Sequence, residues 1–167
     1  MPTKPSQISS QSDEPRLSLQ DYLPYRLAVV ARRTAGSLSR KYAAEFDITI
    51  PEWRVIAHLA EQRACSSGEI GERTAMDKAM VNRAVTRLAA SGLVLASTST
   101  EDRRLNVLKL SRRGRDVYAR IVPIALSHEA SLLEALTPSE HRMLLGILVK
   151  LQRRLDSSKE FANENED

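Results

Sequence analysis

Polar side chains recur along one face of a segment expected to be helical, residues 78–90, and their chemistry suits the reading of DNA bases. Arginine can bond guanine through two hydrogen bonds, and asparagine can do the same for adenine. A basic residue one turn further along is better placed for a phosphate. The alternative is a structural helix with an ordinary solvated face. The candidate DNA-contacting residues are Lys78, Ala79, Asn82, Arg83 and, for phosphate, Arg87, opposite an apolar face of Val81, Ala84, Val85 and Leu88.

A second group of charged residues, Asp102, Arg103 and Arg104, lies in a polar stretch between two segments of alternating apolar residues. Such alternation predicts two strands joined as a β-hairpin. An arginine at a hairpin tip can enter a narrow minor groove, where the negative potential is strongest. We expect Asp102 to pair with a neighbouring arginine and to fix the turn. The alternative is a charged hairpin tip without a function.

The elements around these residues are mostly helical. Three segments of the type Ser/Thr-x-x-Glu, starting at Thr49, Ser66 and Thr137, are capping boxes that open helices. Asp77 caps the helix that carries the candidate base-reading residues, and Gly92 ends it. The expected order is a helix from near Asp21 to about Phe46, helices at about 50–62, 66–74 and 78–90, strands at 93–97 and 105–110, a helix from Ser111 bent or interrupted at Pro123, and a last helix from Thr137.

Charge is concentrated where these candidates lie. The net charge of the chain is +4, but residues 73–120 alone contain eleven basic and four acidic side chains. A basic segment of this kind predicts a polyanionic partner, most simply nucleic acid. Residues 1–17 contain three prolines and four serines with few apolar groups, and the end after Asp156 is acidic. We expect both ends to be disordered.

The sequence gives little support for a disulfide-bonded, membrane-spanning, secreted or catalytic protein. Cys65 is the only cysteine, which excludes an intrachain disulfide. No apolar run approaches the length of a membrane span, and the N-terminus lacks a signal-peptide core, so a cytoplasmic protein is expected. The three histidines fit no metal-ligand spacing, and the chain has neither a glycine-rich phosphate loop nor a nucleophile elbow. We therefore expect no enzyme, metal or cofactor.

Several stretches resemble the MarR family of bacterial regulators. They are Ile48-Thr49-Ile50-Pro51-Glu52-Trp53-Arg54-Val55, Met76-Asp77-Lys78, Val81 to Leu88, Ser91-Gly92-Leu93-Val94, Asp102-Arg103-Arg104, and Leu108-Lys109-Leu110-Ser111 with Gly114. The resemblance implies a mainly α fold: a winged helix-turn-helix with a small β-hairpin wing and N- and C-terminal dimerisation helices. It divides the chain into an arm (1–17), a domain (18–155) and an acidic tail (156–167). Within the domain, about 48–111 would bind DNA, and about 18–47 and 112–155 would form the dimer.

By this resemblance Arg104 is the minor-groove arginine and Asp102 its internal partner. Ala79 and Met80 stand where the family often has small polar residues, which would reduce base readout there. The resemblance also implies a homodimer on a pseudo-palindromic double-stranded operator. The last helices support a dimer independently, because they hold more apolar residues than one small domain needs: Leu132, Leu133, Leu136, Met143, Leu144, Ile147, Leu148 and Leu151.

Members of the family often act as repressors that bind small aromatic acids or their derivatives. Arg26, Arg33 and Arg40 repeat every seven residues, so they share one helix face that could hold a carboxylate or the phosphates of a coenzyme A thioester. A solvated basic face is the alternative. Candidate pocket residues beside them are Tyr22, Tyr25, Trp53, His58 and Tyr118. Two other functions stay open: oxidant sensing through Cys65, and a winged-helix module for protein contacts.

Overall fold

A computed structural model describes the backbone of residues 16–98 and 106–163. The chain divides into two compact units, Met1–Ser37 and Leu38–Asp167. Helix α1 (Leu23–Phe46) crosses the boundary between them. It begins two residues after Asp21, whose carboxylate accepts a hydrogen bond from the Ser18 hydroxyl (2.7 Å) and so caps a turn before the helix.

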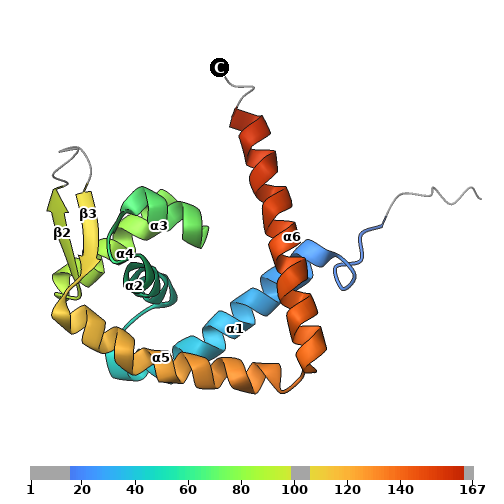
Figure 1. The fold of residues 1–167 in the computed structure, drawn as a ribbon, viewed down its shortest axis with the longest axis horizontal. Coiled ribbons are helices and arrows are strands. Elements are labelled where there is room, and N and C mark those ends of the chain that lie inside the picture. The colour runs from blue at the N-terminus through green and yellow to red at the C-terminus, as the bar shows by residue number, and fades with distance from the viewer. Residues whose placement is uncertain (1–15, 99–105, 164–167) are drawn as a thin grey trace, which may run out of the picture. The chain divides into compact units, whose positions relative to one another are not determined.

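The second unit contains a helix-turn-helix and a small sheet. Helices α2 (Ile50–Gln62), α3 (Ser67–Thr74) and α4 (Lys78–Ala90) pack against one another and against strands β1 (Cys65–Ser66), β2 (Val94–Thr98) and β3 (Asn106–Leu110) (Figure 1). The strands form one antiparallel sheet in the order β1-β3-β2, with Cys65 opposite Leu108 and Val94 opposite Leu110. Helices α5 (Arg112–Leu133) and α6 (Pro138–Asn163) follow. The mainly α winged-helix fold is therefore as predicted.

Local sequence signals account for most helix starts. The predicted capping boxes at Thr49 and Ser66 are present in full, with each side chain accepting from the backbone N–H of the glutamate three residues on. The Thr137 box is also present: the Thr137 N–H donates to Glu140 (2.8 Å), and the Glu140 N–H donates back to the threonine hydroxyl (3.3 Å). Asp77 caps α4 through the Met80 N–H (2.6 Å).

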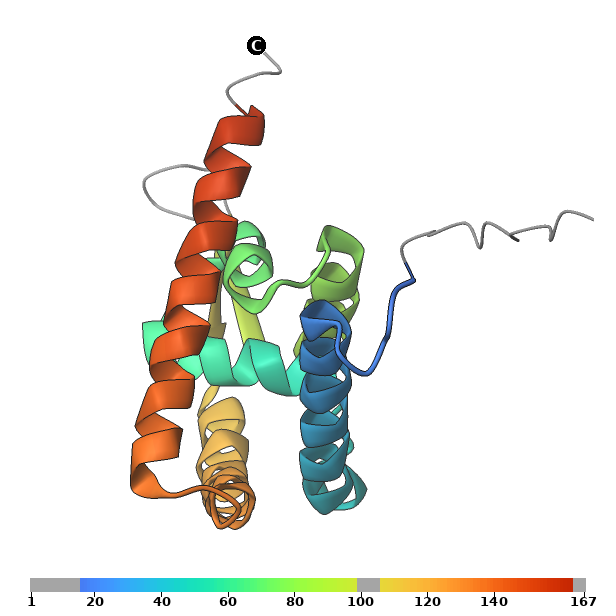
Figure 2. The same cartoon turned by 90° about the vertical axis from the view of Figure 1, so that its right-hand side faces the viewer.

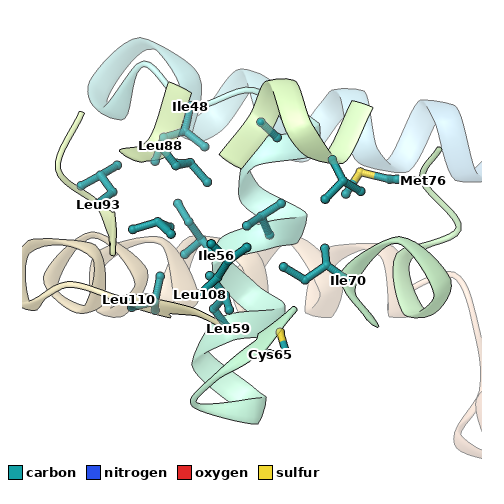
Figure 3. Close-up of a cluster of buried hydrophobic side chains, with 14 of the residues drawn as sticks. Ile48, Ile56, Leu59, Cys65, Ile70, Met76, Leu88, Leu93, Leu108 and Leu110 are labelled. Atoms are coloured by element: carbon teal, nitrogen blue, oxygen red, sulfur yellow. The ribbon is translucent and has the colours of Figure 1, made fainter. Parts of the chain in front are cut away.

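The hydrophobic core of the second unit lies where these helices meet the sheet. Figure 3 shows Ile56 and Leu59 of α2 directed toward Ile70 of α3, Leu88 of α4 and Leu108 of β3. Each of these five side chains is at most 2% exposed. Burying five such side chains supplies roughly 1.5–3 kcal/mol each before the loss of chain entropy. This core fixes α4 against α2 and the sheet.

A close approach joins the sheet to α5. Gly92 has a φ of +70°, which ends α4 in the left-handed region that glycine tolerates. The chain then passes so close to α5 that a Cβ on Gly114 would lie 2.1 Å from the Leu93 carbonyl oxygen. The Ser111 hydroxyl donates to the Gly92 carbonyl (2.7 Å) and accepts from the Gly114 N–H (2.9 Å). Only glycine fits at position 114.

Three expectations differ from the structure. Helix α5 continues through the exposed Pro123, so the interruption that was one of the two expected effects of this proline is absent. Helix α6 extends to Asn163, whereas disorder was expected after Asp156. Strand β1 was not expected, because two residues are too short to show an alternating pattern.

Candidate nucleic-acid interface

The predicted base-reading residues lie on the outer face of α4. Lys78, Ala79, Asn82 and Arg83 are exposed. Val81, Ala84 and Leu88 are buried on the opposite side, and Val85 is partly buried against the core. Figure 2, turned by 90° from Figure 1, shows the loop that connects α3 to α4. The amphipathic division expected from the sequence is therefore present in the structure.

Helix α3 holds the start of α4 by a tight turn. Ala75 ends α3 in the left-handed conformation with a φ of +52°. A Cβ on Gly71 would lie 3.2 Å from the Met76 carbonyl oxygen, so the turn also needs a small residue there. This geometry leaves the first turn of α4 projecting outward, where a major groove can receive a helix.

The two predicted hairpin strands are present, and they pair with Ser97 opposite Val107 and Leu95 opposite Lys109. Its tip lies outside the described residues. The predicted minor-groove residues Asp102, Arg103 and Arg104 all belong to that part.

Arg87 differs from the other basic residues of α4 because carboxylates of its own chain surround it. Its Nε lies 3.2 Å from a Glu52 carboxylate oxygen, and its Nη2 lies 3.0 Å from an Asp47 oxygen. The Glu52 side chain is only 3% exposed. Sequence reasoning missed these contacts, because 35 or more residues separate the partners and nothing in the local pattern signals them.

The same region contains a cleft of about 370 Å³ that the sequence did not predict. Its lining is of mixed charge: Arg87, Arg113 and Arg120 face Glu45, Asp47, Glu52 and Asp116. Arg120 forms an ion pair with Glu45, and its guanidinium lies 4.7 Å from the centre of the Phe46 ring. Arg113 donates to the Ser91 carbonyl (3.1 Å). Because most of these charges already have partners in the protein, the cleft is a junction between helices rather than an open anion site.

The candidate effector residues fall into two groups. Trp53 and Tyr118 stack with ring centres 5.9 Å apart. The ring of Tyr42, which was not among the predicted pocket residues, also lies with its centre 5.9 Å from that of Trp53. Burial raises the pKa of the Tyr42 hydroxyl, and a hydrogen bond with Ser39 offsets part of this shift. His58 is on the same helix as Trp53, and its Nε2 is buried without a hydrogen-bond partner among the described residues.

The remaining candidates are on α1 or just before it. Tyr22, Tyr25, Arg26 and Arg33 belong to the unit Met1–Ser37, and Arg40 to the other unit. All five are exposed. Arg26 and Arg33, seven residues apart in α1 and within one unit, lie on one face of that helix, as their spacing predicted.

Cys65 is buried in β1, and this burial, followed by the nearby Glu69 carboxylate, raises the pKa of its thiol. Oxidant sensing requires the opposite, an accessible thiolate.

No cluster of metal-ligating side chains occurs among the described residues. Within the same part of the chain, no helix has the length and apolar character that a membrane span needs.

Comparison with known proteins agrees with the fold. The sequence profile of the MarR family matches residues 46–105, which contain α2, α3, α4 and the first hairpin strand, β2. HTH-type transcriptional regulator TtmR of Methylorubrum extorquens is 27% identical over 154 residues, which are 92% of this chain and 77% of TtmR. A MarR/EmrR family regulator from Acinetobacter sp. ADP1 has a solved structure that superposes with a TM-score of 0.78 at 26% identity, covering 84% of this chain and 99% of that one.

The helix-turn-helix region of the chain, residues 46–105, matches the MarR family.

The chain is also similar to a second protein of solved structure. BpsR of Bordetella bronchiseptica, whose DNA binding is regulated by 6-hydroxynicotinic acid, superposes with a TM-score of 0.74 at 25% identity, covering 83% of this chain and 98% of BpsR. This chain is thus a DNA-binding transcriptional regulator with a winged helix-turn-helix.

Proposed function

We propose that this MarR-family protein is a homodimeric repressor that leaves its operator when it binds a small anionic aromatic effector. The observation that carries the proposal is the division of α4: an outer face with Asn82 and Arg83, backed by a buried face with Val81 and Leu88. In this proposal α4 enters the major groove, with Lys78 and Ala79 at its leading end. Arg103 and Arg104 of the wing reach the minor groove, with Asp102 fixing the turn. The operator role implies a cytoplasmic protein.

The exposed apolar side chains of α6 support the dimer. Met143 is 65% exposed and Ile147 47%, and both belong to a helix that presents many other aliphatic side chains to solvent. Exposed apolar surface on this scale is typical of an interaction site. We assign residues 18–47 and 112–155 to dimerisation and residues 48–111 to DNA. A two-fold dimer then requires a pseudo-palindrome with half-site centres about 10 base pairs, or a multiple of that, apart.

The effector proposal rests on the arginine face of α1 and on the stacked pair Trp53 and Tyr118. Arginine binds a carboxylate or phosphate through two parallel hydrogen bonds. The regulation of BpsR by an aromatic acid favours the same class here, either the free acid or its coenzyme A thioester. Release requires the effector to prefer a dimer whose two α4 helices are wrongly spaced for successive grooves.

One experiment on the purified protein tests the proposal. The wild-type protein is used to select duplexes from a random-sequence pool, and the enriched duplexes are read for two-fold symmetry. Sedimentation is then compared for wild type and Ile147→Asp, which puts a charge into the expected dimer surface. We expect a symmetric duplex, a wild-type dimer and a dissociated variant. A monomeric wild-type protein that binds the selected duplex tightly would contradict the dimer.

The effector is tested separately by thermal shift with aromatic acids and their coenzyme A thioesters. A ligand that binds the folded state raises the melting temperature. A compound that raises it and also weakens binding to the selected duplex by about 5- to 150-fold would fit the usual range of allosteric coupling. An Arg26/Arg33/Arg40 triple-alanine variant should lose this response. Unchanged effector binding to that variant would rule out the arginine face.

A further inference from the structure

Arg87 occupies a position on α4 from which a phosphate contact was expected, yet its guanidinium is directed toward the start of α2. Arg87 follows Arg83 by four residues, so the two side chains leave the helix about 40° apart around its axis. Arg83 is exposed and has no ion-pair partner among the described residues. Arg87 instead contacts Glu52 and Asp47 through two of its nitrogens. Neighbouring positions on one helix therefore have different partners.

Glu52 is the more consequential of these partners because it is buried. One of its carboxylate oxygens accepts a hydrogen bond from the Thr49 N–H (2.7 Å), which closes the capping box of α2. The other oxygen faces Arg87. Asp47, by contrast, has a side chain that is 95% exposed, and an exposed ion pair contributes little. Removing the guanidinium would leave the Glu52 charge buried without its counter-ion, which is strongly destabilising.

The Glu52–Arg87 ion pair gives α4 a directional contact, which the apolar contacts of this helix lack. Hydrophobic contacts through Val81, Ala84 and Leu88 keep the apolar face of α4 against the core, but such contacts are non-directional. A hydrogen-bonded ion pair has a direction. The rotation of α4 decides where Asn82 and Arg83 point. The Glu52 contact, toward the opposite end of the helix from its Asp77 cap, adds a directional constraint on that rotation.

We propose that Arg87 is a positioning residue: through buried Glu52 it sets the orientation of α4 for base reading, and it does not neutralise a DNA phosphate. This inference rests on the proposed reading role of α4. It makes an unusual prediction about Glu52. Removing an acidic side chain near DNA should strengthen binding if only long-range electrostatics operate. If Glu52 positions α4 through Arg87, the same removal should weaken binding.

The experiment measures binding of the full-length protein to a duplex that the wild type selects from a random pool, over a range of salt concentrations. The variants are Arg87→Gln, Glu52→Gln and the double variant, with Asp116→Asn as the matched control. Asp116 lines the same cleft and carries the same charge, but it does not contact Arg87 in the structure. Thermal unfolding and circular dichroism check that each variant folds.

We expect Arg87→Gln and Glu52→Gln each to weaken binding by about tenfold, and the double variant to bind no more weakly than Arg87→Gln alone. For these variants, the logarithm of the DNA association constant K plotted against the logarithm of the salt concentration should keep the wild-type slope, because no phosphate contact is lost. Asp116→Asn should bind like wild type or slightly more tightly.

Two results would overturn the inference. One is a slope reduced by about 0.9 in Arg87→Gln, which marks a lost phosphate contact. The other is unchanged or tighter binding by Glu52→Gln, and this variant alone decides the question if Arg87→Gln does not fold. A wild-type protein that enriches no duplex at all would instead overturn the reading role of α4, and the inference with it.

Discussion

The winged-helix core and helix α6 are both rich in aliphatic side chains, but only the core buries them within one chain. Val55 and Ile56 of α2 are fully buried. In α6, Met143 and Leu155 are each 65% exposed, and no residue of this helix whose side chain is described is buried. Since burial of apolar area is the main favourable term in folding, contacts within one chain are enough to use the apolar side chains of the core. Helix α6 needs a second surface, which the proposed dimer supplies.

The comparison is sharpest for two isoleucines that differ in exposure, Ile56 at 0% and Ile147 at 47%. Ile56→Ala should lower the free energy of unfolding by about 2–5 kcal/mol, because it removes buried methyl groups and leaves a cavity. Ile147→Ala should act on subunit dissociation instead. Urea unfolding measures the first effect and sedimentation the second. Equal losses of unfolding free energy in the two variants would break the distinction between the regions.

Two glycines give a second matched pair. Gly114→Ala should destabilise the protein by about 1–3 kcal/mol, because its Cβ would meet the Leu93 carbonyl oxygen and the backbone must move. Gly146 in α6 has open space around its Cα, so Gly146→Ala should stabilise the helix by about 0.5–1 kcal/mol. Thermal melts of both variants test this. A loss of stability in Gly146→Ala would indicate that a second chain packs closely at that point.

The smallest effect concerns pH and the Glu69 carboxylate of the α3 capping box. Its pKa is lowered, first by the Ser66 backbone N–H and then by the Ser66 hydroxyl. A lowered folded-state pKa means that this contribution is present above the unfolded pKa and is lost as pH falls through the folded value. Glu69→Gln should therefore melt lower than wild type near neutral pH, with the difference shrinking below about pH 4.5. Melting curves that stay parallel down to acidic pH would contradict the assignment.

Much of the fold could be predicted because its signals are local. The capping boxes at Thr49, Ser66 and Thr137 each need only four consecutive residues, and all three are present. The change from helical to alternating periodicity after Gly92 likewise located the hairpin. The outer and inner faces of α4 followed from periodicity alone.

The features that escaped prediction depend on contacts between distant residues. The Glu52–Arg87 ion pair joins two helices, and either residue by itself looks like an ordinary helix residue. Strand β1 exists because Cys65 pairs with Leu108 far along the chain. The extension of α6 past Asp156 was missed because charge in the last residues was interpreted as disorder, whereas a charged segment can continue an existing helix.

The central claim is that the outer face of α4 reads DNA, and Arg83 tests it most directly. Binding of wild type and Arg83→Ala is measured on the selected duplex and on a set of duplexes carrying each base substitution in one half-site. We expect Arg83→Ala to weaken binding by roughly 1–3 kcal/mol and to lose its preference at one base pair per half-site, because bidentate contact with guanine is removed. Wild-type affinity together with an unchanged pattern of base preference would contradict the account.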